Sequence, residues 1–363
     1  MVRGSKREAA RKEIEGWIRA GEYGPGEKLP SILKMAERLG VSDQSVRKAV
    51  SDLSEAGLVR SVNGVGVFVR EPGGQRGSKF MILAGRQPSP PGTDPRPEAF
   101  LDWEVHNGVL RGLKDAGAEP FWQVVTGAKD EPRALAQQFK EQELAGLISF
   151  RATFNGFLDS TVHAIGAHRV VSTHWSEAPC TLNEVRVRIQ PAIYAALDRA
   201  LELGHRNLAM FYGGNMAEFW SHAERFRIFT AFCAERGLPI GAGCMVATDG
   251  RAMDAYRATL RLLEANSDVT LIFSCNDERA TGVLEALRDR GLTPGREVSV
   301  IGYDDMPGAA QLDLATVRPP REEVGRQAVA LLMRTIEEKK TNQKHWLEAE
   351  AIFRGSLGKV GGG

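Results

Sequence analysis

The chain has 363 residues, of which 42% are hydrophobic and 26% charged, with a net charge of +1. This length accommodates two or three domains with substantial buried cores. The sequence contains no run of eighteen apolar residues, and its charged first 17 residues lack an apolar signal core, so we expect no membrane-spanning or export segment and a cytoplasmic protein.

The cysteines do not form a recognisable framework. They show no CxxC pairing and no histidine at zinc spacing, so we expect reduced, mostly buried thiols and no metal site. The four are Cys180, Cys233, Cys244 and Cys275.

The first predicted helix begins at Ser5, which forms a capping box with Glu8, and continues to Ala20. Ser31 caps a second helix that Gly40 ends, and Ser42 caps a third helix over 43–55. The third helix has an inward face of Val46, Ala49, Val50 and Leu53 and an outward face of Gln44, Ser45, Arg47, Lys48 and Ser51. Two short helices joined by a glycine-containing turn form a helix-turn-helix, whose second helix can enter a DNA major groove.

Residues 58–69 have the pattern of a two-stranded ribbon that turns at Asn63-Gly64. Gly66 lets the backbone pass close to a partner. Helix-turn-helix followed by ribbon predicts a winged helix.

Residues 7–69 resemble the GntR family of bacterial repressors. The matching stretches are PGEKLPS at 25–31, LGVS at 39–42, SVRKA at 45–49, GLV at 57–59 and GVGVFV at 64–69. The chain departs from the family at Leu33 and Asp43, where relatives usually carry arginines that touch DNA, so the operator sequence is not carried over.

The resemblance and the helix faces together give a set of candidate DNA contacts. Gln44 can pair with an adenine edge, and Arg47 and Lys48 can reach phosphate or guanine, although any one of these side chains can equally be a solvated helix face. The candidates are Ser31, Lys34, Ser42, Gln44, Ser45, Arg47, Lys48, Asn63, Gly64 and Gly66.

The first 72 residues carry 13 Lys and Arg against 10 Asp and Glu. This excess is modest for a DNA-binding domain, so affinity should depend on two copies that bind together. We therefore expect a homodimer on a palindromic double-stranded DNA operator.

A Gly-rich stretch at 71–78 predicts a flexible linker between a DNA-binding domain at 1–70 and a second domain at 79–358. In the second domain, apolar runs alternate with helical segments, which predicts parallel sheets covered by helices in two lobes. The runs lie at 80–84, 121–125, 146–150, 169–173, 208–212, 244–247, 270–274 and 298–303. Ligands of such sheets bind at the carboxyl ends of the strands.

Phrases in the second half of this domain resemble the effector-binding domain of LacI/GalR-type repressors. They are ALELGHR at 200–206, Arg225 before Gly237-Leu238, SCND at 274–277, VSVIGYDD at 298–305 and VRPP at 317–320. The match is strong over about 190–355 and weaker before it. It implies an α/β chain: an N-terminal winged helix-turn-helix (α+β) followed by a two-lobed periplasmic-binding-protein-like sensor, the arrangement of the arabinose repressor subgroup.

The resemblance implies that Arg225, Asn276 and Asp304 contact a sugar or sugar-like effector, and the chemistry agrees. An arginine fork donates to adjacent hydroxyls, an amide both donates and accepts, and a carboxylate accepts. Further candidates are Trp220, Phe150 and Arg151, with Trp103 and Trp175 as other aromatic side chains that can equally be core or interface. We interpret Asp277, Asp305 and His205 as structural.

One departure concerns the effector. Where relatives usually place Asp-Asn, this chain has Arg188-Ile189, so the effector stays open and an acidic or phosphorylated sugar becomes a candidate. The Gly-rich linker also replaces the hinge helix of LacI-type repressors, so coupling to DNA should run through dimer geometry.

An enzyme is disfavoured because the sequence has no GxGxxG after a strand, no GxxxxGK[ST], no GxSxG and no HExxH. We expect no catalytic residue and no cofactor. The sequence therefore predicts a ligand-responsive transcriptional regulator, a repressor by resemblance. The alternative is a constitutive DNA-binding protein whose second domain no longer binds a ligand or serves only for dimerisation.

Overall fold

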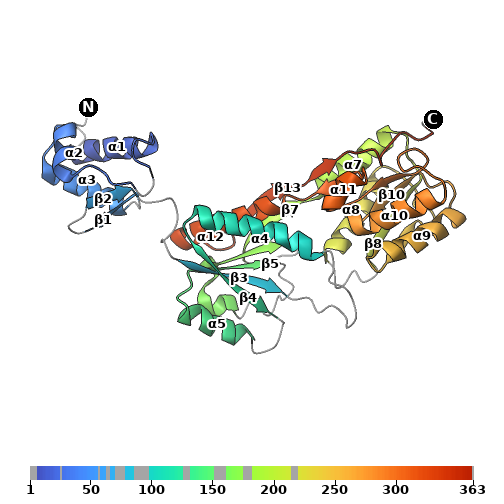
Figure 1. Cartoon of the computed structure of the whole chain (residues 1–363), viewed down its shortest axis with the longest axis horizontal. Helices are drawn as coiled ribbons and strands as arrows, with labels where there is room; N and C mark the ends of the chain where they lie inside the picture. Colours follow the sequence, from blue (N-terminus) through green and yellow to red (C-terminus); the bar gives the residue numbers. More distant parts are fainter. Residues whose placement is uncertain are drawn as a thin grey trace. The chain divides into compact units, whose positions relative to one another are not determined.

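The computed structural model describes residues 6–24, 27–55, 58–62, 66–69, 78–85, 98–125, 131–150, 161–174, 182–213 and 220–361. These residues form two compact units, one within the first 78 residues and the other in nearly all of the rest (Figure 1). The predicted linker lies almost entirely outside the described residues.

The first unit contains three helices and a two-stranded ribbon, in the predicted order. They are α1 (Lys6–Arg19), α2 (Ile32–Leu39), α3 (Asp43–Glu55), β1 (Val59–Val62) and β2 (Gly66–Val69). The inward positions predicted for α3 are all less than 5% exposed, and they join α1 and α2 in one hydrophobic core. The winged helix is therefore confirmed.

Local signals explain where these helices begin and end. The Ser31 side chain accepts a hydrogen bond from the backbone N–H of Lys34 at 3.3 Å, and Gly40 ends α2 with φ of 62°. Ser42 Oγ accepts from the N–H of Ser45 at 3.2 Å at the start of α3. The predicted start of α1 at Ser5 lies outside the described residues.

The wing strands pair antiparallel, with Val59 opposite Val69. Lys28 forms an isolated bridge with Phe68 on the other side of β2. Gly66 has φ of 142°, and a Cβ there would lie 2.6 Å from Cε of Lys28. The close partner predicted for Gly66 is therefore the chain's own Lys28, and the predicted Asn63-Gly64 turn is outside the described residues.

The second unit begins with a lobe built on a six-stranded sheet in which every neighbouring pair is parallel. In spatial order the strands are β13 (Lys344–Glu348), β7 (Asn183–Arg188), β6 (Val170–His174), β5 (Gly146–Phe150), β3 (Lys79–Gly85) and β4 (Glu119–Val125). The helical elements in this lobe include α4 (Glu98–Asp115), α5 (Glu131–Glu141), η1 (Ala167–Arg169) and α12 (Arg321–Glu338).

The second lobe contains a parallel four-stranded sheet and a short antiparallel pair. The strands of the larger sheet are β11 (Ser299–Ile301), β10 (Leu271–Ser274), β8 (Leu208–Gly213) and β9 (Met245–Thr248), and the pair is β12 (Thr316–Arg318) with β14 (Glu350–Ile352). The helices are α7 (Gln190–Glu202), α8 (Trp220–Glu235), α9 (Ala252–Ala265), α10 (Asp277–Asp289) and α11 (Pro307–Gln311). Two lobes of parallel sheet confirm the predicted architecture.

Three described segments carry the chain between the lobes: from β7 into α7, from β12 into α12 and from β13 into β14. The first and third are tied together, because the N–H of Ala349 donates to the carbonyl of Arg188 at 3.1 Å and the Arg188 side chain donates to Glu348 at 2.9 Å. The second places Arg321 at the first position of α12.

The list of predicted strands omits β7, β12, β13 and β14. Their sequences include charged residues, as in NEVRVR and KHWLE, and so lack the apolar runs by which the other strands were predicted. Burial of β7 comes from tertiary packing, since five of its six residues are buried.

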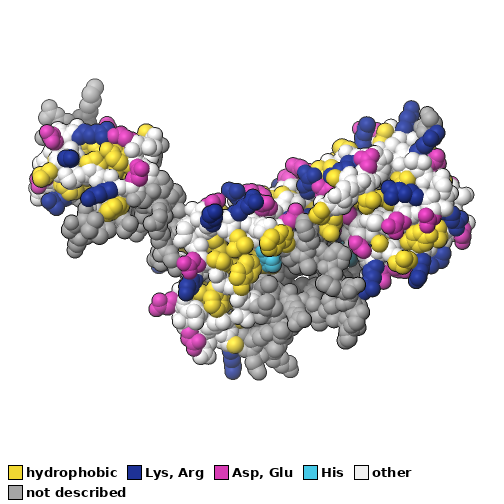
Figure 2. Space-filling model, in the orientation of Figure 1, with side chains coloured by type: hydrophobic (Ala, Val, Ile, Leu, Met, Phe, Trp, Pro, Cys, Tyr) yellow, Lys and Arg dark blue, Asp and Glu magenta, His cyan; other side chains and the backbone are white. Residues whose placement is uncertain are grey.

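Three of the cysteines lie in the described part of the chain, and Cys233, Cys244 and Cys275 are buried and free there, as predicted. Within the same residues no helix is long and apolar enough to cross a membrane. Hydrophobic side chains gather on the visible face of the six-stranded lobe (Figure 2), and Trp103 is 54% exposed, so it is not a core residue.

Helices α9 and α10 approach closely at Gly282, where a Cβ would lie 1.9 Å from the carbonyl oxygen of Ala252. We expect Gly282→Ala to lower the free energy of unfolding of this lobe by about 2–3 kcal/mol, because backbone must move to make room. Denaturant unfolding followed by circular dichroism measures the change. Gly308→Ala is the control, because nothing lies within 4 Å of a Cβ there; equal midpoints for the two variants would contradict the close contact.

Candidate functional site

The outward face of α3 presents Gln44, Arg47 and Lys48, all of them exposed. Ser45 differs from this prediction, because it is half-buried and its hydroxyl lies 2.9 Å from that of Ser42. These two serines hold the start of the helix together, and the three longer side chains project from its exposed face.

The two departures from the family pattern also lie at the surface of this unit. Leu33 is 70% exposed on α2, next to the exposed Lys34. Asp43 accepts the N–H of Gln44 at 2.8 Å and lies 4.0 Å from Arg47 one turn later. A carboxylate this close to Arg47 reduces the positive potential of the helix near its start.

In the second unit, Asn276 lies two residues after the end of β10 and is the N-cap of α10. Its Oδ1 accepts the backbone N–H of Arg279 at 3.0 Å. The predicted acceptor of this amide is therefore already used by the protein, whereas its Nδ2 donates to no described residue.

Asp304 follows β11 with φ of 119° and is 6% exposed. Arg321 donates to it twice at 2.6 Å, once to the backbone carbonyl and once to Oδ1. A non-glycine residue in this backbone region is strained, and the fork of Arg321 holds it there.

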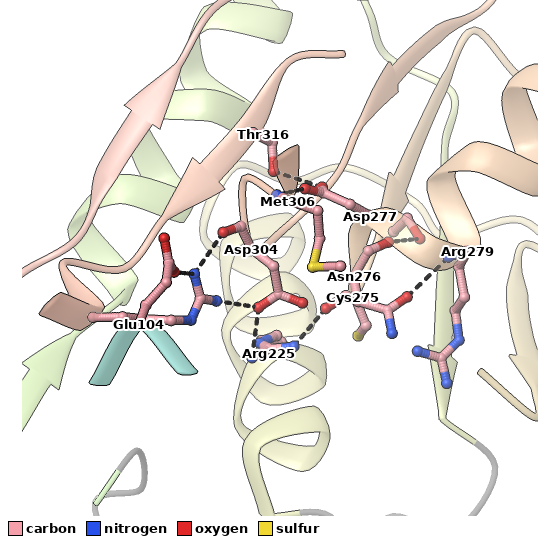
Figure 3. A network of polar contacts seen from close by, with 11 residues as sticks. Glu104, Arg225, Cys275, Asn276, Asp277, Arg279, Asp304, Met306 and Thr316 are labelled. Carbon is pink, nitrogen blue, oxygen red and sulfur yellow. Dashed lines mark hydrogen bonds and ion pairs between the residues drawn. The ribbon is translucent and has the colours of Figure 1, made fainter. Parts of the chain in front are cut away.

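Arg225, on α8, is 8% exposed and lies among the other predicted residues (Figure 3). Its Nη1 donates to the carbonyl of Cys275 at 2.5 Å, and its Nη2 is 3.9 Å from Oδ1 of Asp304. The guanidinium lies 3.5 Å from the centroid of the Tyr303 ring. The structure thus brings Arg225 and Asp304 into contact, with Asn276 beside them.

Sequence reasoning missed Arg321, which connects the lobes. It is 5% exposed, and besides Asp304 it forms an ion pair at 3.5 Å with Glu104 of α4. Burial raises the pKa of the Glu104 carboxyl even though Arg321 acts to lower it. The available signal was an arginine at the first position of a helix, where the helix dipole disfavours a cation.

Sequence reasoning also missed Arg279, a second arginine near the start of a helix. It lies in the first turn of α10 and is among the largest fully buried side chains, at 1% exposure. Its Nε donates to the hydroxyl of Thr248 at 2.7 Å. A buried guanidinium with a neutral partner is costly, which makes this residue a candidate for function.

Asp277 and Asp305 hold the loops around this site, in keeping with the structural interpretation. Asp277 accepts the N–H of Met306 at 2.8 Å and the hydroxyl of Thr316 at 2.7 Å. Asp305 accepts from the guanidinium groups of Arg318 and Arg354, at 2.6 and 2.8 Å, in place of the backbone amides expected for a turn.

The other candidates lie elsewhere or outside the described residues. Phe150 is the last residue of β5, is 6% exposed and packs edge-on against His106 at 4.5 Å, so it presents little surface to a ligand. Trp220 begins α8, instead of preceding it, and its side chain is not described. Arg151 and Trp175 lie outside the described residues.

His205 is structural, as predicted. It is 2% exposed, and its Nε2 lies 2.9 Å from the carbonyl of Gly358. Across the described ranges no group of His, Cys, Asp and Glu side chains is arranged to hold a metal ion.

Comparison with known families and proteins identifies both units. Residues 6–69 match the gntR family of bacterial regulatory proteins, and residues 197–357 match the periplasmic binding protein-like domain. The chain therefore joins a gntR-type domain to a periplasmic binding protein-like domain, and together with the relatives below this makes it a ligand-responsive DNA-binding transcriptional regulator.

One curated relative matches over nearly the whole chain, and another matches over less than half of it. The arabinose metabolism transcriptional repressor of Geobacillus stearothermophilus is 22% identical over 351 residues, which cover 92% of each chain. The catabolite control protein A of Priestia megaterium is 28% identical over 158 residues, 43% of this chain and 47% of that protein.

Two solved structures share the fold. The lac repressor dimer bound to operator and the anti-inducer ONPF aligns with a TM-score of 0.64 at 16% identity, over 78% of this chain and 95% of that one. A LacI-family regulator from Enterococcus faecium with bound ribose aligns with a TM-score of 0.62 at 20% identity, over 78% and 100%.

Burial, with a contribution from the Asp304 charge, raises the pKa of Asp277 to about 7. Between about pH 4 and 7 the folded state then binds this proton while the unfolded chain, with an ordinary aspartate pKa, does not. The free energy of unfolding should therefore fall as pH rises through this window, by up to about 1.4 kcal/mol per pH unit.

Denaturant unfolding of the full chain at several pH values measures this slope. Asp277→Asn should flatten it, whereas Glu285→Gln, an exposed position on the same helix, should leave it unchanged. A slope that is the same in all three proteins would contradict the assignment to Asp277.

Proposed function

We propose that this regulator binds a sugar or sugar-like molecule between its lobes and that binding changes its affinity for DNA. The observation that carries the proposal is the polar network that runs from Glu104 through Arg321 and Asp304 to Arg225. It connects α4 of the first lobe with the carboxyl ends of β10 and β11 in the second. A ligand there contacts both lobes, so its binding can favour one arrangement over another.

The relatives support the same ligand class. One is named for arabinose metabolism, and a structural neighbour contains ribose. The side chains of Arg225, Asn276 and Asp304 offer the donors and acceptors that hydroxyl groups require. The relative that matches over nearly the whole chain is named a transcriptional repressor, and we propose that this chain represses transcription too.

We propose a homodimer that places two α3 helices in successive major grooves of a palindromic operator, about one helical turn apart. A structural neighbour is a dimer bound to operator. We place the reader at 1–70, the linker at 71–78 and the sensor at 79–358. A DNA reader shares a compartment with the chromosome, so we place the protein in the cytoplasm.

One observation favours the alternative of a silent sensor. The predicted ligand-binding atoms of Arg225 and Asp304 already bond to other residues of the protein. In that case no sugar stabilises the chain and DNA affinity is the same with or without one, which the experiments below distinguish.

Lys48→Ala tests the reader. Lys48 is exposed on α3 and its ammonium should contact a phosphate, so its loss should weaken binding to any duplex DNA and lower the slope of log affinity against log salt by about 1. Fluorescence anisotropy of a labelled duplex at several salt concentrations measures both changes. Lys12→Ala on the exposed side of α1 is the control; an unchanged slope for Lys48→Ala would remove this residue from the interface.

Arg225→Ala tests the sensor. A sugar at 100 times its dissociation constant should stabilise the unaltered chain by about 2.7 kcal/mol, and this gain should vanish in the variant. Thermal unfolding against a panel of sugars, sugar acids and sugar phosphates measures it, with the exposed Arg227→Ala on the same helix as the control. A ligand response that persists in Arg225→Ala would place the binding site elsewhere.

A further inference from the structure

Two buried guanidinium groups in the second lobe have N–H donors without acceptors. Nε of Arg225 and Nη1 of Arg279 are both fully buried, and neither bonds to any described residue. The side chains are 8% and 1% exposed. A buried donor on a charged group that lacks an acceptor destabilises the fold, so an arrangement with two of them indicates a missing anionic partner.

Asn276 adds a third donor to the same place. Its Oδ1 caps α10, while its Nδ2 donates to no described residue. Figure 3 shows the amide of Asn276 and the guanidinium groups of Arg225 and Arg279 on the same side of the Cys275–Asn276 segment. The amino end of α10, which carries a partial positive charge, lies at this segment as well.

Groups of both signs lie near these donors. Arg279 forms no ion pair with any described residue; burial lowers its pKa and Arg225 lowers it further, while Cys275, Asp249 and Asp304 act in the opposite direction. The carboxylate of Asp304 is shared between Arg225 and Arg321. An anion between Arg225 and Arg279 would relieve their repulsion.

The Arg279 side chain is also held in position. Gly213 is the last residue of β8, and Gly250 lies two residues after β9. A Cβ at either glycine would lie 3.3 Å from Nη2 of Arg279. Thr248 fixes Nε. A side chain that is 1% exposed and held through Nε is preorganised for a ligand and loses little freedom on binding.

We propose that an anionic group of the effector, a carboxylate or a phosphate, binds between Arg225 and Arg279 with Asn276 as a further donor, so that the effector is a sugar acid or a sugar phosphate. This inference rests on the proposed sensor function and names the ligand class within it. Arg279 is then the residue that selects the anion over the neutral sugar.

The test uses the full chain and matched sets of probes. Two sets contain a neutral sugar, its uronic acid and its phosphate ester: glucose, glucuronate and glucose 6-phosphate, and the corresponding galactose set. A third set pairs ribose with ribose 5-phosphate. We expect a charged member to bind at least tenfold more tightly than its neutral parent in calorimetric titration. A preference for the acid or for the ester distinguishes the carboxylate from the phosphate.

Arg279→Gln and Arg279→Met remove the charge at similar volume. We expect the anion's dissociation constant to rise about 10- to 100-fold in both, towards that of the neutral parent, because a charge-assisted hydrogen bond is lost. Arg279→Met should also raise the melting temperature of the ligand-free chain, since it removes a buried and poorly compensated cation. Arg288→Gln, exposed on the same helix, is the control and should preserve the anion preference.

Other results would overturn the inference. If a neutral sugar binds as tightly as its acid and ester, or if the Arg279 variants keep the anion preference, the anion site is wrong while the sugar-sensing function stands. If Arg279→Met lowers the melting temperature and weakens neutral and charged ligands alike, Arg279 is structural. Binding of no probe in any set would contradict both the inference and the proposed function.

Discussion

The arrangement of the sensor depends on the buried pairing of Arg321 with Asp304. Arg321 begins the helix that returns the chain to the first lobe, and it bonds both the carbonyl and the carboxylate of a residue in the second. Removal of either partner leaves an uncompensated buried charge, which costs about 3–5 kcal/mol. The pair therefore fixes the strained backbone of Asp304, and it places the Asp304 carboxylate 3.9 Å from the guanidinium of Arg225. A ligand that reaches this carboxylate shares it with two guanidinium groups that the fold has already aligned.

The reader and the sensor use charge in opposite ways. In the reader, exposed side chains on α3 provide a modest positive surface that Asp43 partly offsets, so its affinity for DNA should be weak and sensitive to salt. In the sensor, the charges of Arg225, Arg279 and Arg321 are buried, where each interaction is stronger and less screened. Discrimination between ligands therefore depends more on the few buried contacts of the sensor than on bulk electrostatics.

The reader was almost completely predictable because its signals are local. Ser31, Gly40 and Ser42 mark helix ends, and apolar periodicity identifies the buried face. In the sensor, apolar runs predicted the parallel strands, and the family resemblance predicted Arg225 and Asp304, which the structure brings together. The position of Arg279 and Arg321 in the first turn of a helix was only a weak signal, because a charged residue there is ordinarily solvated, and only the packing of distant segments buries it. The strands β7 and β13 also contain charged residues, so apolar runs did not predict them.

The return of the chain at residues 344–352 has a consequence for synthesis. This segment supplies β13 to the edge of the first lobe's sheet and β14 to the second lobe's antiparallel pair. Neither lobe can complete its sheet before this segment has left the ribosome, whereas the reader needs only the first 69 residues. During translation the reader can therefore fold before the sensor is complete. The interval corresponds to the synthesis of some 280 residues, or roughly 15–60 s at about 5–20 residues per second.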